Sequence, residues 1–160
     1  MFTGSPFIFP SLGPTAYLFF FSPLAEASSP RNAVLGHAIG LFCGYAAFAL
    51  TMAATPPFGM HAGIDGPTVL AAALSLSATG AFMVLFRVSH PPAGATTLIV
   101  SLGIISQPKD LVIIEAAVVL PTAQALAINR PPDYLTHFGG MASPQERPLS
   151  GRPLRAKAPF

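Results

Sequence analysis

The long stretches without charge constrain this chain most strongly. Between Arg31 and Arg87 the sole formal charge is Asp65. Over the whole chain Asp, Glu, Lys and Arg make 9% of the residues, whereas a soluble domain carries about 25%. So few charges cannot cover a surface that faces water, and much of this surface must therefore face lipid. The sequence predicts an integral membrane protein with the lipid bilayer as its surroundings.

Five apolar segments follow one another, at residues 7–21, 33–54, 67–86, 93–106 and 111–128. A straight spanning helix needs roughly 20 apolar residues, and the second, third and fifth segments come close to that length. Pro30 precedes the second segment, and Asn32 is its candidate N-cap. The first and fourth segments are short and begin among prolines and glycines. The first is expected to be a half-helix or a re-entrant element, and the fourth is too short to span upright with ease.

Small residues recur every four positions in two of these segments. Gly36, Gly40 and Gly44 form one ridge on a helix, and such ridges let helix backbones approach closely in lipid. Two rows of the third segment are predicted to face this ridge: Ala71, Ser75 and Thr79, and Ala73, Ser77 and Ala81. The predicted fold is therefore all-α, a polytopic transmembrane helix bundle with glycine-mediated packing and one or two broken or re-entrant helices.

The basic residues are placed unevenly along the chain. If all five segments cross, Arg31, Arg87, Arg130 and the basic tail share one side, with only Lys109 opposite. The positive-inside rule then places the arginine-rich side in the cytoplasm of a multi-pass protein of the cell (inner) membrane. This topology leaves the N-terminus outside, so we expect an additional helix upstream. We divide the chain into a transmembrane domain, 1–130, and a disordered cytoplasmic tail rich in proline and arginine, 131–160.

Several function classes lack their motifs. No glycine-rich phosphate loop, hydrolase elbow or zinc-protease motif is present. The single cysteine, Cys43, excludes an intrachain disulfide, and we expect no metal and no cofactor. No aromatic interleaving accompanies the basic residues, so nucleic acid is not an expected partner. A non-enzyme is the main expectation, although His37 and His90 as an acid–base pair stay open.

Three polar clusters interrupt the apolar segments. They contain Ser11, Gly13, Pro14 and Thr15; Arg31, Asn32 and His37; and Arg87, His90, Pro91, Pro92, Gly94, Thr96 and Thr97. Irregular backbone at membrane depth is tolerated only where it is buried in protein or lines a wet cavity. A helix that starts inside the membrane presents N–H groups and a positive dipole end, which suit a small anion. The clusters are therefore candidates for a substrate pathway.

Each singled-out residue also has a plain structural interpretation. His37 in an apolar helix is typical of a hydrogen-bonded core residue. Arg31 and Arg87 are simply explained as anchors at the membrane interface. Glu115 is expected either to reach toward the interface or to pair with an arginine or relay protons.

The clusters resemble the HPP family, integral membrane proteins named for a His-Pro-Pro motif. The resemblance rests on residues 89–98 (SHPPAGATTL), 29–32 (SPRN) followed by Leu35-Gly36-His37, 11–16 (SLGPTA) and Asn129-Arg130, in the order of the family. It implies a transporter with about four membrane helices, and relatives in photosynthetic organisms are linked to nitrite transport. It also implies a further hydrophobic helix upstream of Ser11, whereas the tail from Pro131 is unlike the family ending.

The favoured function is transport of a small solute, an inorganic anion such as nitrite. The pathway would run between Pro14 and Thr15, His37 and the segment from His90 to Thr97, with Arg31 or Arg87 attracting the anion. The alternative is a non-transporting membrane anchor or sensor that acts with a partner protein. The glycine ridge also permits a homo-oligomer.

Overall fold

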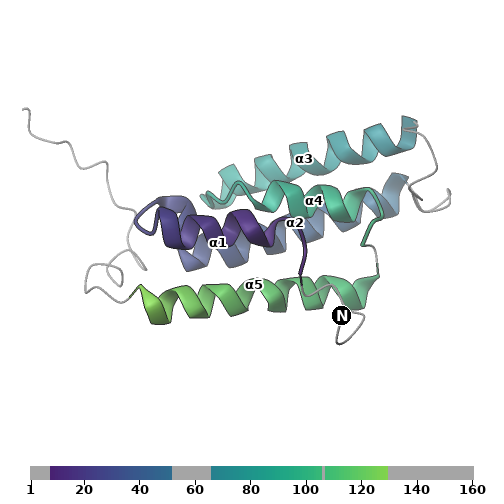
Figure 1. Ribbon diagram of the computed structural model, residues 1–160. Coiled ribbons are helices and arrows are strands. Elements are labelled where there is room, and N and C mark those ends of the chain that lie inside the picture. Colours follow the sequence, from purple (N-terminus) through teal and green to yellow (C-terminus); the bar gives the residue numbers. More distant parts are fainter. Residues whose placement is uncertain (1–7, 52–65, 106, 130–160) are drawn as a thin grey trace, which may run out of the picture.

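The computed structural model describes residues 8–51, 66–105 and 107–129, and over these residues every regular element is helical (Figure 1). In chain order the elements are α1 (Leu12–Phe21), the short 3₁₀ helix η1 (Glu26–Ser28), α2 (Pro30–Thr51), α3 (Gly66–Phe86), α4 (Ala93–Ser101) and α5 (Pro108–Ile128). The predicted tail, 131–160, lies outside the described residues.

Three of these helices, α2, α3 and α5, have the length and the apolar composition needed to cross a membrane. They contain 22, 21 and 21 residues. By contrast, α1 has 10 residues and α4 has 9, and at 1.5 Å per residue each covers only about half of a hydrocarbon core roughly 30 Å thick. The predicted all-α transmembrane bundle with short, broken helices is confirmed.

The start of α2 is fixed by Ser29 and not by Asn32, so the predicted N-cap was wrong. Pro30 is the first helical residue, a position that does not need a backbone N–H. The Ser29 hydroxyl accepts the backbone N–H of Asn32 at 3.3 Å, as a capping side chain does. The Asn32 side chain instead donates to the Glu26 carbonyl at 3.0 Å, which ties η1 to α2.

The break between α3 and α4 begins at Arg87, which has a φ of 53°. A residue in this left-handed conformation ends many helices. The N–H of Arg87 donates a hydrogen bond to the Val84 carbonyl, and the N–H of Val88 donates one to the Met83 carbonyl. The chain then runs through His90 and two prolines before α4 begins at Ala93. This extended segment and α4 together connect one end of the bundle to the other (Figure 1).

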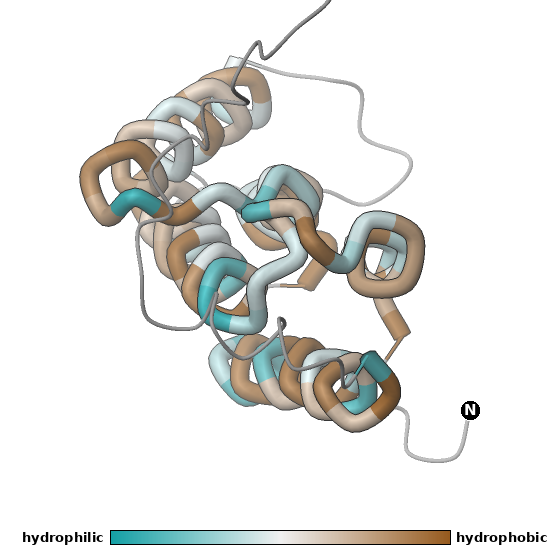
Figure 2. Tube along the Cα trace, turned by 90° about the vertical axis from the view of Figure 1, so that its left-hand side faces the viewer, coloured by the Kyte–Doolittle hydropathy of each residue, from teal (hydrophilic) through white to brown (hydrophobic). Residues whose placement is uncertain are grey.

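Helix α2 is central and packs against α3, α4 and α5. Large apolar side chains on the outer faces are exposed, for example Leu50 at 82% and Val84 at 80%. Hydrophobic residues occur along every helix (Figure 2). Exposed apolar surface over so many turns is the surface that lipid covers.

The prediction that both rows of small residues in α3 face the bundle was wrong for one row. In α3 the row of Ala71, Ser75 and Thr79 is buried, but Ala73, Ser77 and Ala81 are exposed. The glycine ridge of α2 packs closely on α4 and on His90. Both rows of α3 have suitable spacing, but only one of them can turn toward the bundle.

Candidate functional site

Five polar side chains from α1, α2, α4 and their flanking turns are sealed inside the bundle. Each is at most 1% exposed: Ser11, Thr15, His37, His90 and Thr96. Buried polar groups are costly unless they find partners. We call these five residues the buried polar network.

The members of the network form a continuous series of hydrogen-bond contacts. Ser11 Oγ lies 2.6 Å from Thr96 Oγ1, and Thr96 Oγ1 lies 2.7 Å from His37 Nδ1. On the other side of its ring, His37 Nε2 lies 3.0 Å from Thr15 Oγ1. Thr15 Oγ1 is also 3.1 Å from His90 Nε2. Both nitrogens of His37 are therefore in contact with threonine hydroxyls.

The series ends at the backbone of η1. His90 Nδ1 lies 2.8 Å from the carbonyl oxygen of Ala27. A carbonyl only accepts, so Nδ1 must carry the proton. His90 belongs to the segment between α3 and α4, outside the three long helices.

Two half-helices bring their N-terminal ends to this network. Ser11 immediately precedes α1, and Thr96 lies in the first turn of α4. From there α1 runs toward one end of the bundle and α4 toward the other (Figure 1). The N-terminal ends of both half-helices, which carry partial positive charge, thus meet inside the protein.

The glycines of α2 make this meeting possible. A Cβ added at Gly36 would lie 2.8 Å from His90 Cβ. At Gly40 it would lie 2.8 Å from the Ala93 carbonyl oxygen and from Thr97 Oγ1, and at Gly44 it would lie 2.7 Å from the Thr97 carbonyl oxygen. Any side chain at these three positions would push α4 and His90 away from α2.

A second polar contact lies beside the network. Thr97 Oγ1 is 3.0 Å from Thr79 Oγ1 of α3 and donates to the Ala93 carbonyl at 3.0 Å. Thr79 was predicted as a packing residue and not as a site residue. Ala27 was missed entirely, because a backbone carbonyl leaves no mark in the sequence. Thr79 could have been found from its place in the buried row of α3.

Other predicted pathway residues lie outside the hydrogen-bonded network. Arg31 and Arg87 are exposed, and so is Gly13. Asn32 is buried but bonded to η1. Gly94 in α4 is partly buried.

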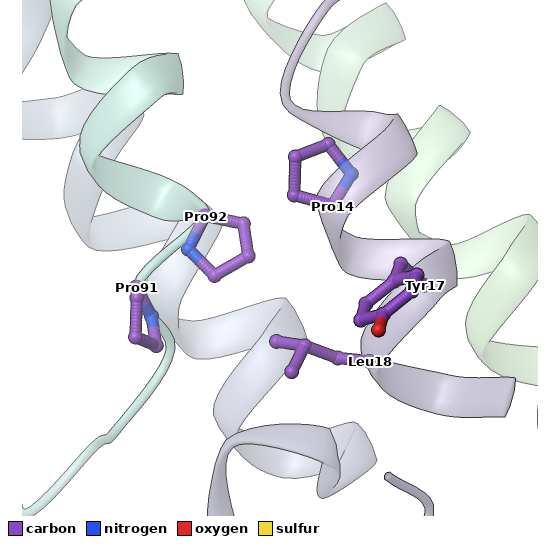
Figure 3. A pocket seen from close by; sticks show the side chains of 5 residues that line it. All are labelled: Pro14, Tyr17, Leu18, Pro91 and Pro92. Atoms are coloured by element: carbon purple, nitrogen blue, oxygen red, sulfur yellow. The ribbon is translucent and has the colours of Figure 1, made fainter. Parts of the chain in front are cut away.

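A shallow apolar pocket lies between α1 and the turn that contains Pro91 and Pro92 (Figure 3). It has a volume of about 380 Å³ and is lined by Pro14, Tyr17, Leu18, Pro91 and Pro92. Pro14 adjoins Thr15 in the chain and Pro91 adjoins His90. Two residues of the network, Thr15 and His90, are thus chain neighbours of residues that line the pocket.

Among residues 8–51, 66–105 and 107–129, no group of three or more His, Cys, Asp or Glu side chains is placed to hold a metal ion. The network offers two histidines and three hydroxyls, which are donors and acceptors of hydrogen bonds. Such a set can bind a small polar solute or exchange protons.

The comparisons with known proteins agree with the resemblance seen in the sequence. A family model described as the HPP transmembrane region matches residues 1–134. Searches of curated proteins and of solved structures found no match.

Proposed function

The chain belongs to the HPP family of membrane proteins, and from this premise we propose that it transports a small inorganic anion such as nitrite across the cell (inner) membrane. The observation that carries the proposal is the buried polar network. Five polar side chains gather where two half-helices begin, inside a bundle whose outer faces are apolar.

The anion site would lie at the N-terminal ends of α1 and α4. In transporters with broken helices, such ends point at anionic substrate groups near the middle of the membrane. The hydroxyls of Ser11, Thr15 and Thr96 would replace the hydration of the anion. The pocket between Pro14 and Pro92 would be the entry, and exposed Arg31 and Arg87 would raise the local anion concentration. Neither a cofactor nor enzymatic chemistry belongs to this proposal.

Uptake of nitrite into proteoliposomes tests the function. Wild-type protein should raise uptake well above that of protein-free vesicles, which corrects for nitrous acid that crosses lipid unaided. His90→Ala removes a ring that is hydrogen-bonded to both Thr15 and Ala27. It should lower the protein-dependent uptake at least about tenfold, which corresponds to roughly 1.4 kcal/mol of lost interaction free energy.

The matched control is Ser77→Ala, on the exposed face of α3, which should transport like wild type. Equal uptake by wild type and His90→Ala would remove His90 from the mechanism. A wild type that matches empty vesicles would support the alternative of a non-transporting anchor or sensor. In that case a partner protein, or a second copy of the chain, would have to bind the exposed apolar faces.

A further inference from the structure

We propose that the protein carries one proton with each anion and that His90, beside Thr15, binds this proton. The inference rests on the proposed transport function and adds the coupled ion. It comes from the directions that the hydrogen bonds of the buried polar network must take.

With both histidines neutral, one arrangement satisfies the whole network. The Nδ1–H of His90 donates to the Ala27 carbonyl, so its bare Nε2 must accept, and the Thr15 hydroxyl is the donor in reach. Thr15 then accepts from His37 Nε2–H. The remaining nitrogen of His37 accepts from Thr96, and Thr96 accepts from Ser11. All five bonds point the same way, from Ser11 toward Ala27.

Thr15 has a second acceptor that this arrangement leaves unused. Its Oγ1 lies 3.0 Å from the carbonyl oxygen of Ser11, and a hydroxyl has one proton to donate. When a proton binds His90 Nε2, that nitrogen becomes a donor to Thr15 Oγ1. The Thr15 hydroxyl can then turn to the Ser11 carbonyl without moving its oxygen. Both protonation states of His90 therefore find a complete set of partners.

The surroundings of His90 limit the network to one added proton. The His37 ring from α2 lies 5.0 Å away between centroids, and two imidazolium ions at that distance would repel strongly. Thr15 of α1 and the Ala27 carbonyl of η1 are uncharged. The other ionisable side chains of the neighbouring segments, Glu26, Arg31 and Arg87, are exposed.

The charges balance for one anion and one proton. Proton binding gives His90 a charge of +1, and the anion brings −1, so the loaded site is neutral. Release of both restores neutral His90, and the Thr15 hydroxyl turns back from the Ser11 carbonyl to donate a hydrogen bond to His90 Nε2. No covalent bond other than N–H is made or broken. A neutral pair avoids the cost of moving a lone charge through hydrocarbon, which is a physical reason for coupling.

The coupling is tested in buffer-loaded proteoliposomes, with nitrite added outside under either a proton gradient or a membrane potential. With one-to-one cotransport, a tenfold inward proton gradient should drive nitrite toward about tenfold accumulation. The initial rate should exceed that of protein-free vesicles, in which nitrous acid reaches the same end point more slowly. A positive-inside potential set by potassium and valinomycin should change uptake little. If the membrane potential drives nitrite uptake and the proton gradient does not affect it, the proton coupling is overturned but transport is not. If neither gradient gives protein-dependent uptake, the transport function is overturned as well.

Variants locate the proton. His90→Gln keeps hydrogen-bonding groups but cannot be protonated, so nitrite uptake by this variant should lose its response to the proton gradient. Thr15→Ser keeps the hydroxyl and should keep coupling, whereas Thr15→Val should lose it. Ser77→Ala on the exposed face of α3 is the control and should match wild type. Full proton-driven accumulation in both His90→Gln and Thr15→Val would overturn the assignment.

Discussion

Glu115 of α5 lacks the partners that every member of the buried polar network has. Both of its carboxylate oxygens are buried and have no hydrogen-bond partner within the described part of the chain. The expectation that this side chain reaches the interface was therefore wrong, and no arginine pairs with it among those residues. A buried polar group without a partner costs about 1–3 kcal/mol, so this position is a weak point of the bundle.

Glu115→Leu should stabilise the folded protein. The substitution replaces an unpaired polar group with an apolar one of similar size, and we expect a gain of about 1–3 kcal/mol in the free energy of unfolding. The measurement is thermal unfolding in detergent, with the exposed Gln124→Leu on the same helix as a control that should shift little. A less stable Glu115→Leu protein would show that the carboxyl group has a partner that stabilises the fold.

The chemistry-bearing residues of the site were largely predictable from the sequence, but their contacts were not. Prolines and glycines beside Ser11, Thr15, His90 and Thr96 mark broken helices, and polar residues at such breaks must find partners. The acceptor of His90 is a carbonyl, a group that all residues share, and was not predictable. The cluster also included Gly13, although its side of α1 is exposed.

At the level of helices, the glycine ridge of α2 decides how close α4 can lie. Gly40→Ala should destabilise the bundle by about 1–3 kcal/mol, because the new Cβ would lie 2.8 Å from the Ala93 backbone oxygen and a backbone atom cannot easily move aside. Gly80→Ala on α3 is the matched control, since nothing lies within 4 Å of its added Cβ. That variant should gain up to about 1 kcal/mol from helix propensity. Thermal unfolding in detergent compares them, and equal shifts would contradict close packing at Gly40.

The spacing of small residues predicted this ridge but not its partner. A four-residue repeat places residues on one side of a helix, yet the same repeat occurs twice on α3 and can face any neighbour. Helix α4 was expected from its apolar stretch, but its end at Ser101 was not. The turn after it contains Gly103, whose φ is 72°. A Cβ added at Gly103 would lie 2.8 Å from Phe48 Cε2. That long-range contact cannot be read from local sequence.

At the scale of the whole molecule, the helix ends place the basic residues of the described segments on two sides of the bundle. Helix α2 begins and α3 ends at the same end of the bundle, and α5 begins at the opposite end (Figure 1). Arg31 follows the start of α2, Arg87 follows the end of α3, and Lys109 lies in the first turn of α5. Although α1 and α4 are too short to cross the membrane, the two arginines and Lys109 lie on opposite sides, as expected if every segment crossed. The extended stretch before α4 adds the length that α4 lacks for the chain to return from one side to the other.

Labelling from one side of the membrane tests this division in intact cells. Arg31→Cys and Arg87→Cys should both be protected from a membrane-impermeant maleimide added outside, because the positive-inside rule places them in the cytoplasm. Lys109→Cys should be labelled. The native Cys43 is buried at 3% exposure, so unmodified protein gives the background. Opening the cells should expose the two arginine positions. Labelling of Arg31→Cys and Lys109→Cys from the same side would contradict a spanning α2 and α5, and with it a site buried at mid-membrane between two half-helices.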